Sequence, residues 1–593
     1  MNISIKMVGG VILSTYVLQA FSITLTPNQI NNGNIPGSYS TVDFYTSDGS
    51  WAPNITLPKN AADKSTITIH ADATYSSTLD LANTDIPLTS LKLSTGDTQK
   101  LVFDAAQQRW LVDVLDYTSN GVGATIPSST RKIVRYKILD NNWGPSIIFP
   151  TTALPGAIIV IESTAARTGN IAADNITYAS TMKVATGEKY AFIFHPQLKK
   201  WYIVTAPIHW LQANNLIAGK MQPPVGPRTV LTLPKKAASL AIYLPDSAGD
   251  RDRLRIVSQS DAPSTVRNEN VDFSGSMQIA NGDTYDFMWV AEKQKWVKMS
   301  SPSRSYNAGA LKNGAVPMES IPTTTIYASN GNWVPVVALP VNAKPGDRVL
   351  FKSDATWGFQ VVPGRKAATF TSQTISIGDS AAFIVDASNR WQLETGNITM
   401  LNIYSDKVAI ALGEPGARAR QMESFRLTNE ALENSRVNFR LKMVGLMRHR
   451  DQGKTLGDAL NLLRDDPVVQ AERKRLGANA LYYEGAEEGC GLAWLNANAH
   501  NMVASGSINC GTTVMRHEFG HNMGLAHGDN NSGSTFYATG YTLFGTVMGG
   551  NSMPYYSTPK IYDPVLGMAI GIEGKIDAVR AMNERFPVVS NFR

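Results

Sequence analysis

Hydrophobic and polar residues alternate with a period of two over most of the first two thirds of the chain. Between about residues 36 and 396, short runs rich in Ser, Thr, Val and Ile are broken repeatedly by Gly, Pro, Asn and Asp. Such alternation is typical of strands with one buried face, and the interrupting residues favour turns. The pattern therefore predicts that this whole region is built of β-strands.

A two-part repeat runs through this region. The first part is Trp, then Pro two residues later, then Leu-Pro or Phe-Pro; it occurs at Trp51–Pro58, Trp143–Pro150 and Trp333–Pro340, with a degenerate copy at Leu233-Pro234. The second part is Gly, an acidic residue, a strand, a polar turn, a basic residue and Trp. Its four copies are Gly96–Trp110, Gly187–Trp201, Gly282–Trp296 and Gly378–Trp391.

Four copies of the second part predict four tandem all-β modules of ordinary domain size. We expect each module to be a small antiparallel sandwich or barrel. The predicted bounds are residues 36–116, 130–206, 222–300 and 321–396.

The recurring Trp residues have two interpretations, a platform that stacks on sugars or a packed core. Core packing is favoured, because these residues hold fixed places in every copy and a large buried aromatic stabilises such a small module. If the modules bind a ligand, we expect their variable loops to make the contacts.

From about residue 400 the pattern changes to one typical of an α/β domain, which we place at residues 397–593. Apolar residues at helical spacing alternate with short strand-like runs. We predict strands at 399–404, 436–444 and 480–483, and helices at 416–434, within 456–476 and at 574–584.

The N-terminus has the pattern of a secretory signal peptide. A short segment with one Lys precedes an apolar run over residues 7–18, and small residues follow it. A membrane anchor or a buried helix is the alternative, but the run is shorter than a bilayer span requires. We predict a signal peptide at residues 1–22, a secreted protein and no membrane span.

Composition narrows the possible partners. The chain is 43% hydrophobic and 17% charged, which is typical of a globular protein. Its formal charge of +6 is small and no Lys/Arg-rich run stands out, so we expect no nucleic-acid partner. Cys490 and Cys510 are the two cysteines. Export favours a disulfide between them over two buried free thiols.

The segment at residues 512–528, TTVMRHEFGHNMGLAHG, has the spacing of a zinc site. His517 and His521 are four residues apart, so a helix places both imidazoles on one face. Gly524 can take a positive φ, end the helix and turn the chain back so that His527 becomes a third ligand. Three neutral imidazoles leave a fourth position for water, as in catalytic zinc sites. We predict one Zn²⁺ per chain.

Glu518 lies next to the first of these ligands and is expected to act as general base. The alternative is a helix whose histidines are solvated or satisfied in a core. It is disfavoured because three of the chain's eight His fall within eleven residues at this spacing.

The motif resembles that of the metzincin zinc endopeptidases, and the resemblance covers about residues 400–593. It implies that Gly545–Gly549 is the Met-turn, with Met548 beneath the ligands, and that Tyr555–Pro559 forms a wall of the substrate pocket. It also implies a substrate-binding edge strand at Gly491, Leu492, Ala493 and Trp494. Gly528 stands where adamalysin-type members have Asp, and Gly550 where astacin- and serralysin-type members have a metal-binding Tyr.

The order of signal, four β-modules and metzincin domain resembles secreted bacterial endopeptidases that cleave host O-glycoproteins. This resemblance implies extracellular glycoprotein substrates, type II secretion, a role in virulence and a possible dedicated secretion chaperone. The leading hypothesis is therefore a secreted zinc endopeptidase whose substrate adds a strand beside residues 491–496.

Two alternatives remain open. The first is a glycan-binding adhesin with a relic protease domain, which is disfavoured because neither a ligand nor the base is missing. The second is that residues 36–396 form an inhibitory pro-region, which predicts a cleavage between about residues 396 and 400.

Overall fold

The computed structural model describes residues 22–30, 32–118, 124–141, 146–178, 182–224, 226–317, 322–528, 533–563 and 567–592. Residues 1–21 of the predicted signal peptide lie outside the described residues, as do Trp143 of the repeat and Asp529. The chain divides into two units, Met1–Leu115 and Asp116–Arg593, which are described separately. None of the helices within these described ranges is long and apolar enough to cross a membrane.

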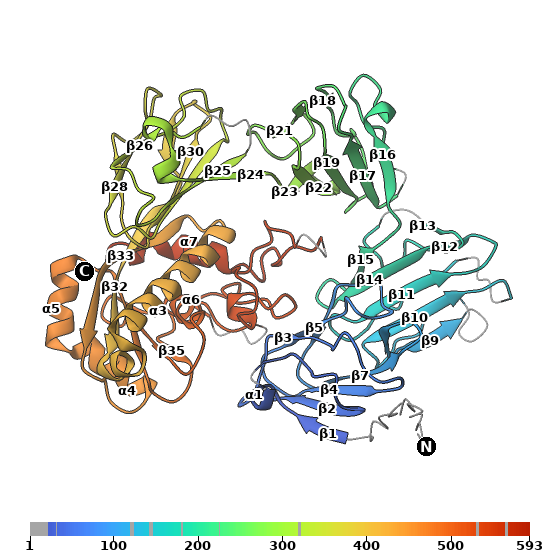
Figure 1. Ribbon diagram of the computed structural model, residues 1–593, viewed down its shortest axis with the longest axis horizontal. Helices are drawn as coiled ribbons and strands as arrows, with labels where there is room; N and C mark the ends of the chain where they lie inside the picture. The colour runs from blue at the N-terminus through green and yellow to red at the C-terminus, as the bar shows by residue number, and fades with distance from the viewer. Residues whose placement is uncertain are drawn as a thin grey trace, which may run out of the picture. The chain divides into compact units, whose positions relative to one another are not determined.

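The first unit is module 1, which has a five-stranded sheet and a three-stranded sheet in its described residues (Figure 1). The larger sheet has the order β1 (Ser22–Leu25), β2 (Thr41–Thr46), β4 (Thr66–Ala71), β7 (Asp97–Asp104) and β8 (Arg109–Val112). The smaller sheet consists of β3 (Asn54–Ile55), β5 (Ser77–Asp80) and β6 (Ser90–Leu93), and a short helix, α1 (Pro27–Ile30), follows β1.

Modules 2 to 4 repeat this arrangement. Module 2 has β9 (Leu115–Thr118), β10 (Ile133–Ile138), β11 (Ile158–Ser163), β14 (Lys189–His195) and β15 (Lys200–Thr205), with β12 (Gly169–Ile171) and β13 (Met182–Val184) in its second sheet. Module 3 has β16 (His209–Gln212), β17 (Arg228–Leu233), β19 (Arg253–Ser258), β22 (Thr284–Val290) and β23 (Lys295–Ser300), with β18 (Ala241–Ile242), β20 (Ser264–Val266) and β21 (Gln278–Ile279). Module 4 has β24 (Ser303–Asn307), β25 (Thr323–Ala328), β27 (Arg348–Ser353), β30 (Ser380–Val385) and β31 (Trp391–Leu393), with β26 (Val336–Ala338), β28 (Phe359–Val362) and β29 (Gln373–Ile375).

The predicted sandwich is confirmed, but its sheets are mixed rather than antiparallel. In module 1, β1, β2 and β4 run parallel, whereas β4, β7 and β8 are antiparallel neighbours. The physical reason is the connection between β2 and β4, which passes through β3 in the other sheet. A crossover of this kind returns the chain in the same direction, as parallel neighbours require.

A buried Trp joins the two parts of the repeat in every module. The indole Nε1 of each donates a hydrogen bond to a Pro carbonyl, at distances of 2.9, 2.8, 2.9 and 3.0 Å. The pairs are Trp110–Pro58, Trp201–Pro150, Trp296–Pro245 and Trp391–Pro340. All four side chains are at most 1% exposed, so core packing is the correct interpretation of these residues.

The third pair corrects the assignment of the degenerate copy. Its Pro is Pro245 rather than Pro234, and the true partner of the motif is therefore Leu244-Pro245. Leu233 instead ends the sheet strand β17. The sequence misled because Ala238 stands where the other copies have their first Trp.

The protease domain has a five-stranded sheet of order β33-β32-β34-β36-β35 in its described residues. Its strands are β32 (Gly396–Ser405), β33 (Phe439–His449), β34 (Ala480–Gly485), β35 (Gly491–Ala493) and β36 (Val503–Ser507). Its helices are α3 (Asp406–Asn434), α4 (Leu456–Asp465), α5 (Pro467–Leu476), α6 (Val514–Asn522) and α7 (Ala578–Val589). Only β35 is antiparallel to its neighbour. One core lies between the sheet and α3, α6 and α7, and a second lies under α4 and α5.

All three predicted helical stretches differ in their bounds. Helix α7 begins four residues later and ends five residues later than the predicted helix at 574–584. Helix α3 begins at Asp406, ten residues before the predicted start, because Ser405 Oγ caps it by accepting from the backbone N–H of Val408. The kink at Gly413 and Pro415 hides this first segment from periodicity. The stretch at 456–476 is two helices, because Asp466 caps a new helix that begins at Pro467.

Modules 2 and 4 pack directly on the protease domain. In module 4, Arg348 forms ion pairs with Glu394 at 2.7 Å and with Glu433 of α3. In module 2, His195 Nε2 lies 2.6 Å from the hydroxyl oxygen of Tyr541. An apolar cluster containing Tyr202 and Tyr541 surrounds this contact. The protease domain therefore folds against its modules within the second unit.

The junction between module 4 and the protease domain is buried. Residues 396–400 belong to β32, which lies between β33 and β34 in the sheet. Ile398 and Met400 are at most 1% exposed. Cleavage there, as the pro-region hypothesis requires, would need a central strand to leave the sheet. The fold argues against that hypothesis.

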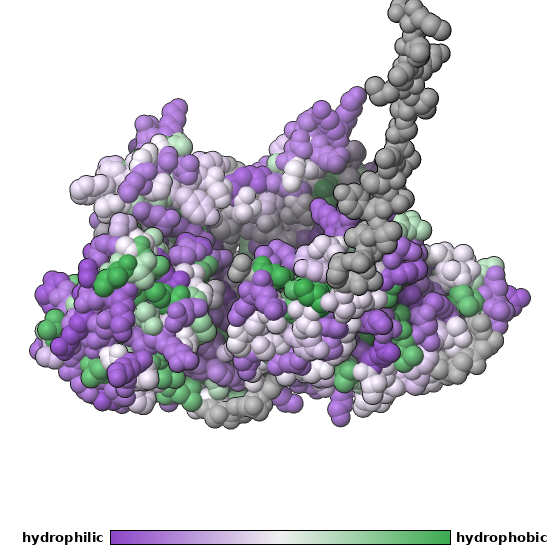
Figure 2. Space-filling view, turned by 60° about the horizontal axis from the view of Figure 1, so that its bottom comes forward, coloured by the Kyte–Doolittle hydropathy of each residue, from purple (hydrophilic) through white to green (hydrophobic). Residues whose placement is uncertain are grey.

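The surface carries few large apolar areas on the face drawn in Figure 2. That face is mostly hydrophilic, and its hydrophobic residues lie in small separate groups. This distribution is typical of a globular protein surface.

The indole–carbonyl hydrogen bond of each module is expected to stabilise it measurably. Trp391→Phe should lower the unfolding free energy of module 4 by about 1–3 kcal/mol, because the Pro340 carbonyl loses its donor. Trp357→Phe is the matched control in the same module, since Trp357 is 70% exposed, and should change it by less than about 0.5 kcal/mol. Hydrogen exchange of module 4 amides measures both, and equal effects would contradict the assigned role.

Candidate metal centre and catalytic site

Helix α6 carries three of the predicted site residues and ends where the motif requires. His517, Glu518 and His521 lie within Val514–Asn522, and Gly524 has a φ of +92°. A Cβ at this glycine would also lie 2.5 Å from Ser534 Oγ. Both conformation and space therefore require glycine, and the chain turns back toward the helix.

The three histidines meet at one point. His527 Nε2 lies 2.9 Å from His517 Nε2 and 3.1 Å from His521 Nε2. Tetrahedral zinc with Zn–N bonds of about 2.0–2.1 Å places its nitrogens about 3.3 Å apart, close to this spacing. Imidazole ligands with an open fourth position suit zinc, and these three residues fit one Zn²⁺.

Backbone carbonyls fix the orientation of two ligands. His517 Nδ1 lies 2.8 Å from the Val547 carbonyl oxygen, and His521 Nδ1 lies 2.8 Å from that of Leu525. A carbonyl only accepts, so each Nδ1 carries the proton and each Nε2 presents its lone pair. Burial lowers the pKa of His517 to about 3 and that of His521 to about 4. Both rings are therefore neutral at physiological pH, as metal binding requires.

The predicted Met-turn lies beneath the zinc helix. Met548 is in the short helix η5 (Val547–Gly549), which also supplies the carbonyl that orients His517. Gly520 of α6 has no space for a side chain, because a Cβ there would overlap Met548 Sδ. The turn therefore both supports the helix and orients one ligand.

The side chain of Glu518 extends from α6 toward the edge of the sheet. The residue is 6% exposed, and burial raises the pKa of its carboxyl to about 8. Its carboxylate fits over Gly491, where a Cβ would lie 2.5 Å from Glu518 Oε1. A cation held by the neighbouring histidines would favour the charged carboxylate. The arrangement suits a group that exchanges a proton beside a metal.

The predicted edge strand is at the edge of the sheet and next to Glu518. Strand β35 (Gly491–Ala493) pairs antiparallel with β36, and the described residues place no strand on its other side. Leu492 is 44% exposed, whereas Trp494, just after the strand, packs against the core. Asn522 Nδ2 donates to the Trp494 carbonyl at 3.0 Å and so ties the strand to the end of α6.

Cys490 and Cys510 form a disulfide. It joins the residue before β35 to the segment that leads into α6. Arg420 reinforces this connection by donating to the Cys510 carbonyl at 2.6 Å and to Glu484 Oε1 at 2.7 Å. No local sequence pattern indicates this role of Arg420, because its partners are 64 and 90 residues away.

The predicted pocket wall at residues 555–559 is largely internal. Tyr556, Ser557 and Thr558 are at most 1% exposed. The Tyr556 hydroxyl donates to the Arg516 carbonyl at 2.6 Å, so this residue supports α6 from behind.

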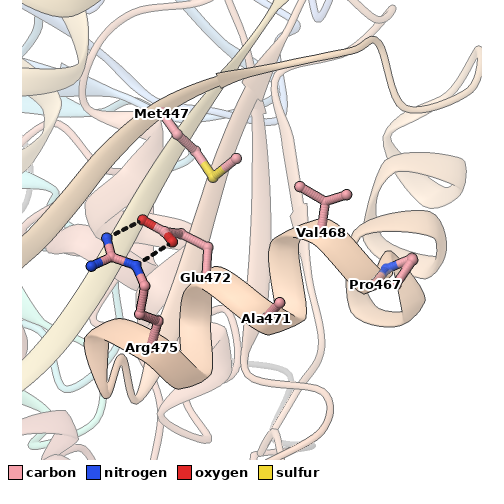
Figure 3. A pocket seen from close by; sticks show the side chains of 6 residues that line it. All are labelled: Met447, Pro467, Val468, Ala471, Glu472 and Arg475. Atoms are coloured by element: carbon pink, nitrogen blue, oxygen red, sulfur yellow. Dashed lines mark hydrogen bonds and ion pairs between the residues drawn. The ribbon is translucent and has the colours of Figure 1, made fainter.

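An apolar depression elsewhere in the domain is separate from this site (Figure 3). It lies between Met447 of β33 and helix α5, where Glu472 and Arg475 form an ion pair. Strand β33 is at the opposite edge of the sheet from β35. The depression is therefore not the catalytic cleft.

Removal of a ligand should remove the metal. His527→Ala is expected to lower the zinc content from one ion per chain to a small fraction after dialysis, because catalytic zinc sites need three protein ligands and only two would remain. His500→Ala is the control, since His500 is exposed and outside the site. Elemental analysis measures both, and zinc retained by His527→Ala would contradict the assignment.

The space over Gly491 should be essential for activity. Gly491→Ala places a methyl group 2.5 Å from Glu518 Oε1, and displacement of the base should lower kcat by about 10–100-fold. Gly511→Ala is the control nearby, since a Cβ there would lie 3.8 Å from Thr513 Oγ1, an ordinary van der Waals contact. Zinc content should be unchanged in both variants, and a fully active Gly491→Ala would exclude this placement of the base.

Two family models match the chain. The model described as "Metalloprotease StcE, beta-sandwich domain" matches residues 39–114, 131–205, 231–300 and 321–395. The model described as "Metallo-peptidase family M12B Reprolysin-like" matches residues 420–528, which include the zinc helix and its three histidines.

Similar proteins cover the chain to different extents. A chain in a solved structure titled "Structure of a chaperone-substrate complex" is 34% identical, with a TM-score of 0.73; the match covers 96% of this chain and 99% of that one. The "Peptidyl-Asp metalloendopeptidase" of Pseudomonas aeruginosa is 28% identical over 222 residues, which is 30% of this chain and 37% of that protein. The chain thus spans little more than a third of that relative's length. The chain thus joins four StcE-type β-sandwich domains to a reprolysin-like M12B metallopeptidase domain.

Proposed function

We propose that this protein is a secreted zinc endopeptidase that hydrolyses peptide bonds in O-glycosylated host proteins. The observation that carries the proposal is the convergence of three imidazole Nε2 atoms beside the buried carboxylate of Glu518 and the open edge of β35. Ligands, base and a surface for an extended substrate thus occur together.

His517, His521 and His527 hold the metal in this proposal. Bound zinc supplies a Lewis acid and lowers the pKa of water toward neutrality. Glu518 accepts the proton of the attacking water at its carboxylate and then donates it to the leaving amine. The substrate backbone pairs with β35 as an added antiparallel or parallel strand, which orients the scissile carbonyl.

The β-sandwich modules support a glycoprotein substrate. They are of the type found in the metalloprotease StcE, and the order of domains resembles CpaA, the glycoprotein-cleaving metalloendopeptidase of Acinetobacter. Module 4 and module 2 are held against the protease domain by buried polar contacts. Their loops would therefore keep a fixed position relative to the cleft within the second unit.

Export completes the proposal. The N-terminal pattern favours a signal peptide, and the resemblance favours type II secretion and a role in virulence. The similar solved chain comes from a chaperone–substrate complex. This similarity supports a chaperone as a partner of the present protein.

The adhesin alternative has less support from the geometry. A relic site would be free to lose the backbone contacts of its ligands, yet both Nδ1–carbonyl contacts are present. Met548 also remains packed under α6.

Replacement of the base gives a direct test. Glu518→Gln should retain one zinc and the fold while kcat falls by about 10²–10⁴-fold, because an amide cannot accept the proton. Peptide cleavage and elemental analysis on the same preparation measure the two properties. Near-normal turnover would refute the assignment of Glu518 as the base. If Glu518→Gln loses its zinc, the Glu518→Asp variant is measured in its place.

Glycan dependence is tested separately. We expect cleavage of native O-glycoproteins and at least about tenfold slower cleavage of the same proteins after enzymatic deglycosylation, since multivalent contacts raise the local substrate concentration. A short unglycosylated peptide serves as the control. Equal rates on both protein forms would leave the peptidase proposal standing and reject the glycoprotein specificity.

A further inference from the structure

Tyr482 of β34 has a buried hydroxyl group whose position calls for an explanation. The residue is 1% exposed, and the described residues offer its hydroxyl no hydrogen-bond partner. Burying a hydroxyl without a partner costs free energy, so such groups in folded proteins usually contact water or a functional group. Glu484 on the same face is different, because Arg420 pairs with it.

The hydroxyl reaches across the sheet toward the catalytic base. Its oxygen occupies the space over Gly506 of β36, where an added Cβ would overlap it. Gly506 is the cross-strand partner of Gly491, over which the Glu518 carboxylate lies. The two facing glycines thus make room for these two oxygens and for Val514 Cγ1 of α6, which lies 2.5 Å from the Cβ position of Gly491 and 3.3 Å from that of Gly506.

Each of the two oxygens lies within 2.5 Å of the Cβ position of its glycine. Directly opposite Cβ positions in an antiparallel pair are about 4.5–5.5 Å apart. Two hydrogen bonds of about 2.8 Å in series span such a distance through one water molecule. The carboxylate of Glu518 has no protein donor within the part of the chain that the structure describes.

The hydroxyl can serve as the donor. Burial, together with the charges of Glu484 and Glu518, raises the pKa of Tyr482 well above its ordinary value. It therefore keeps its proton. The terminal torsion of a Glu side chain is broad, so a carboxylate without a donor is free to rotate between orientations.

We propose that Tyr482 positions the catalytic base: its hydroxyl donates to one buried water, and that water donates to the inner carboxylate oxygen of Glu518. The outer oxygen is then held toward the cleft for proton transfer. This inference rests on the proposed role of Glu518. Tyr482 touches neither substrate nor metal, and it acts only through the base.

Tyr482→Phe removes the hydroxyl and keeps the ring. We expect kcat to fall about tenfold, as for outer-shell partners of catalytic groups, with KM changed less than about twofold and zinc content unchanged. Tyr483→Phe is the matched control on the opposite face, where the hydroxyl contacts Glu487 Oε1 at 3.2 Å and accepts from the Gln452 backbone N–H at 3.3 Å. It should leave kcat within about twofold. A Tyr482→Phe variant with kcat within twofold of the parent would overturn the proposal.

A crystal structure of the zinc-loaded protein supplies a readout independent of activity. We expect an ordered water within hydrogen-bond distance of both Tyr482 Oη and Glu518, and its loss in Tyr482→Phe. A hydroxyl that contacts another group, or the lack of such a water, would overturn the inference. Failure of the proposed function is distinguishable, because the parent protein would then lack peptidase activity and Glu518→Gln would change nothing.

Discussion

The site depends on the close approach of helix α6 to the edge of the sheet. Gly491 on β35 and Gly506 on β36 face the helix. Because glycine has no side chain, these residues leave room for the Glu518 carboxylate and the Tyr482 hydroxyl. Any Cβ at residue 491 would collide with the Glu518 carboxylate. The same approach places the open edge of β35 beside the histidines. One packing constraint therefore brings together the three histidines, the Glu518 carboxylate and the open edge of β35.

Backbone groups hold the ligands in place. The carbonyls of Val547 and Leu525 orient two imidazoles, and η5 combines one of these contacts with the support that Met548 gives to α6. The disulfide between Cys490 and Cys510 and the contact of Arg420 with the Cys510 carbonyl fix the chain on the other side of the helix. Groups held in this way need little rearrangement when a cation binds or a proton moves.

The modules are stabilised internally and also joined to the protease domain. Each uses a buried indole that donates to a Pro carbonyl about fifty residues earlier, as in Trp391 and Pro340. Module 4 then meets α3 through Arg348 and Glu433, which Arg440 also contacts. Breaking one partner of a buried ion pair is strongly destabilising, whereas the intact pair mainly specifies how the parts fit. Modules 2 and 4 are thus expected to fold in contact with the catalytic domain.

The sequence by itself determined what depends on local spacing. The positions of His517, His521 and Gly524 follow from helical geometry and backbone conformation, and the repeat predicted four β-modules because the same turn and Trp pattern recurs. The edge strand at Gly491 was predicted from family resemblance rather than from periodicity. Tertiary structure alone decided the mixed direction of the module strands, the choice of Pro245 as partner of Trp296, the inward position of Tyr556, and the contact of Arg348 with Glu433. Periodicity reports which face of a segment is buried, but strand direction and partners far along the chain depend on how the whole chain crosses and packs.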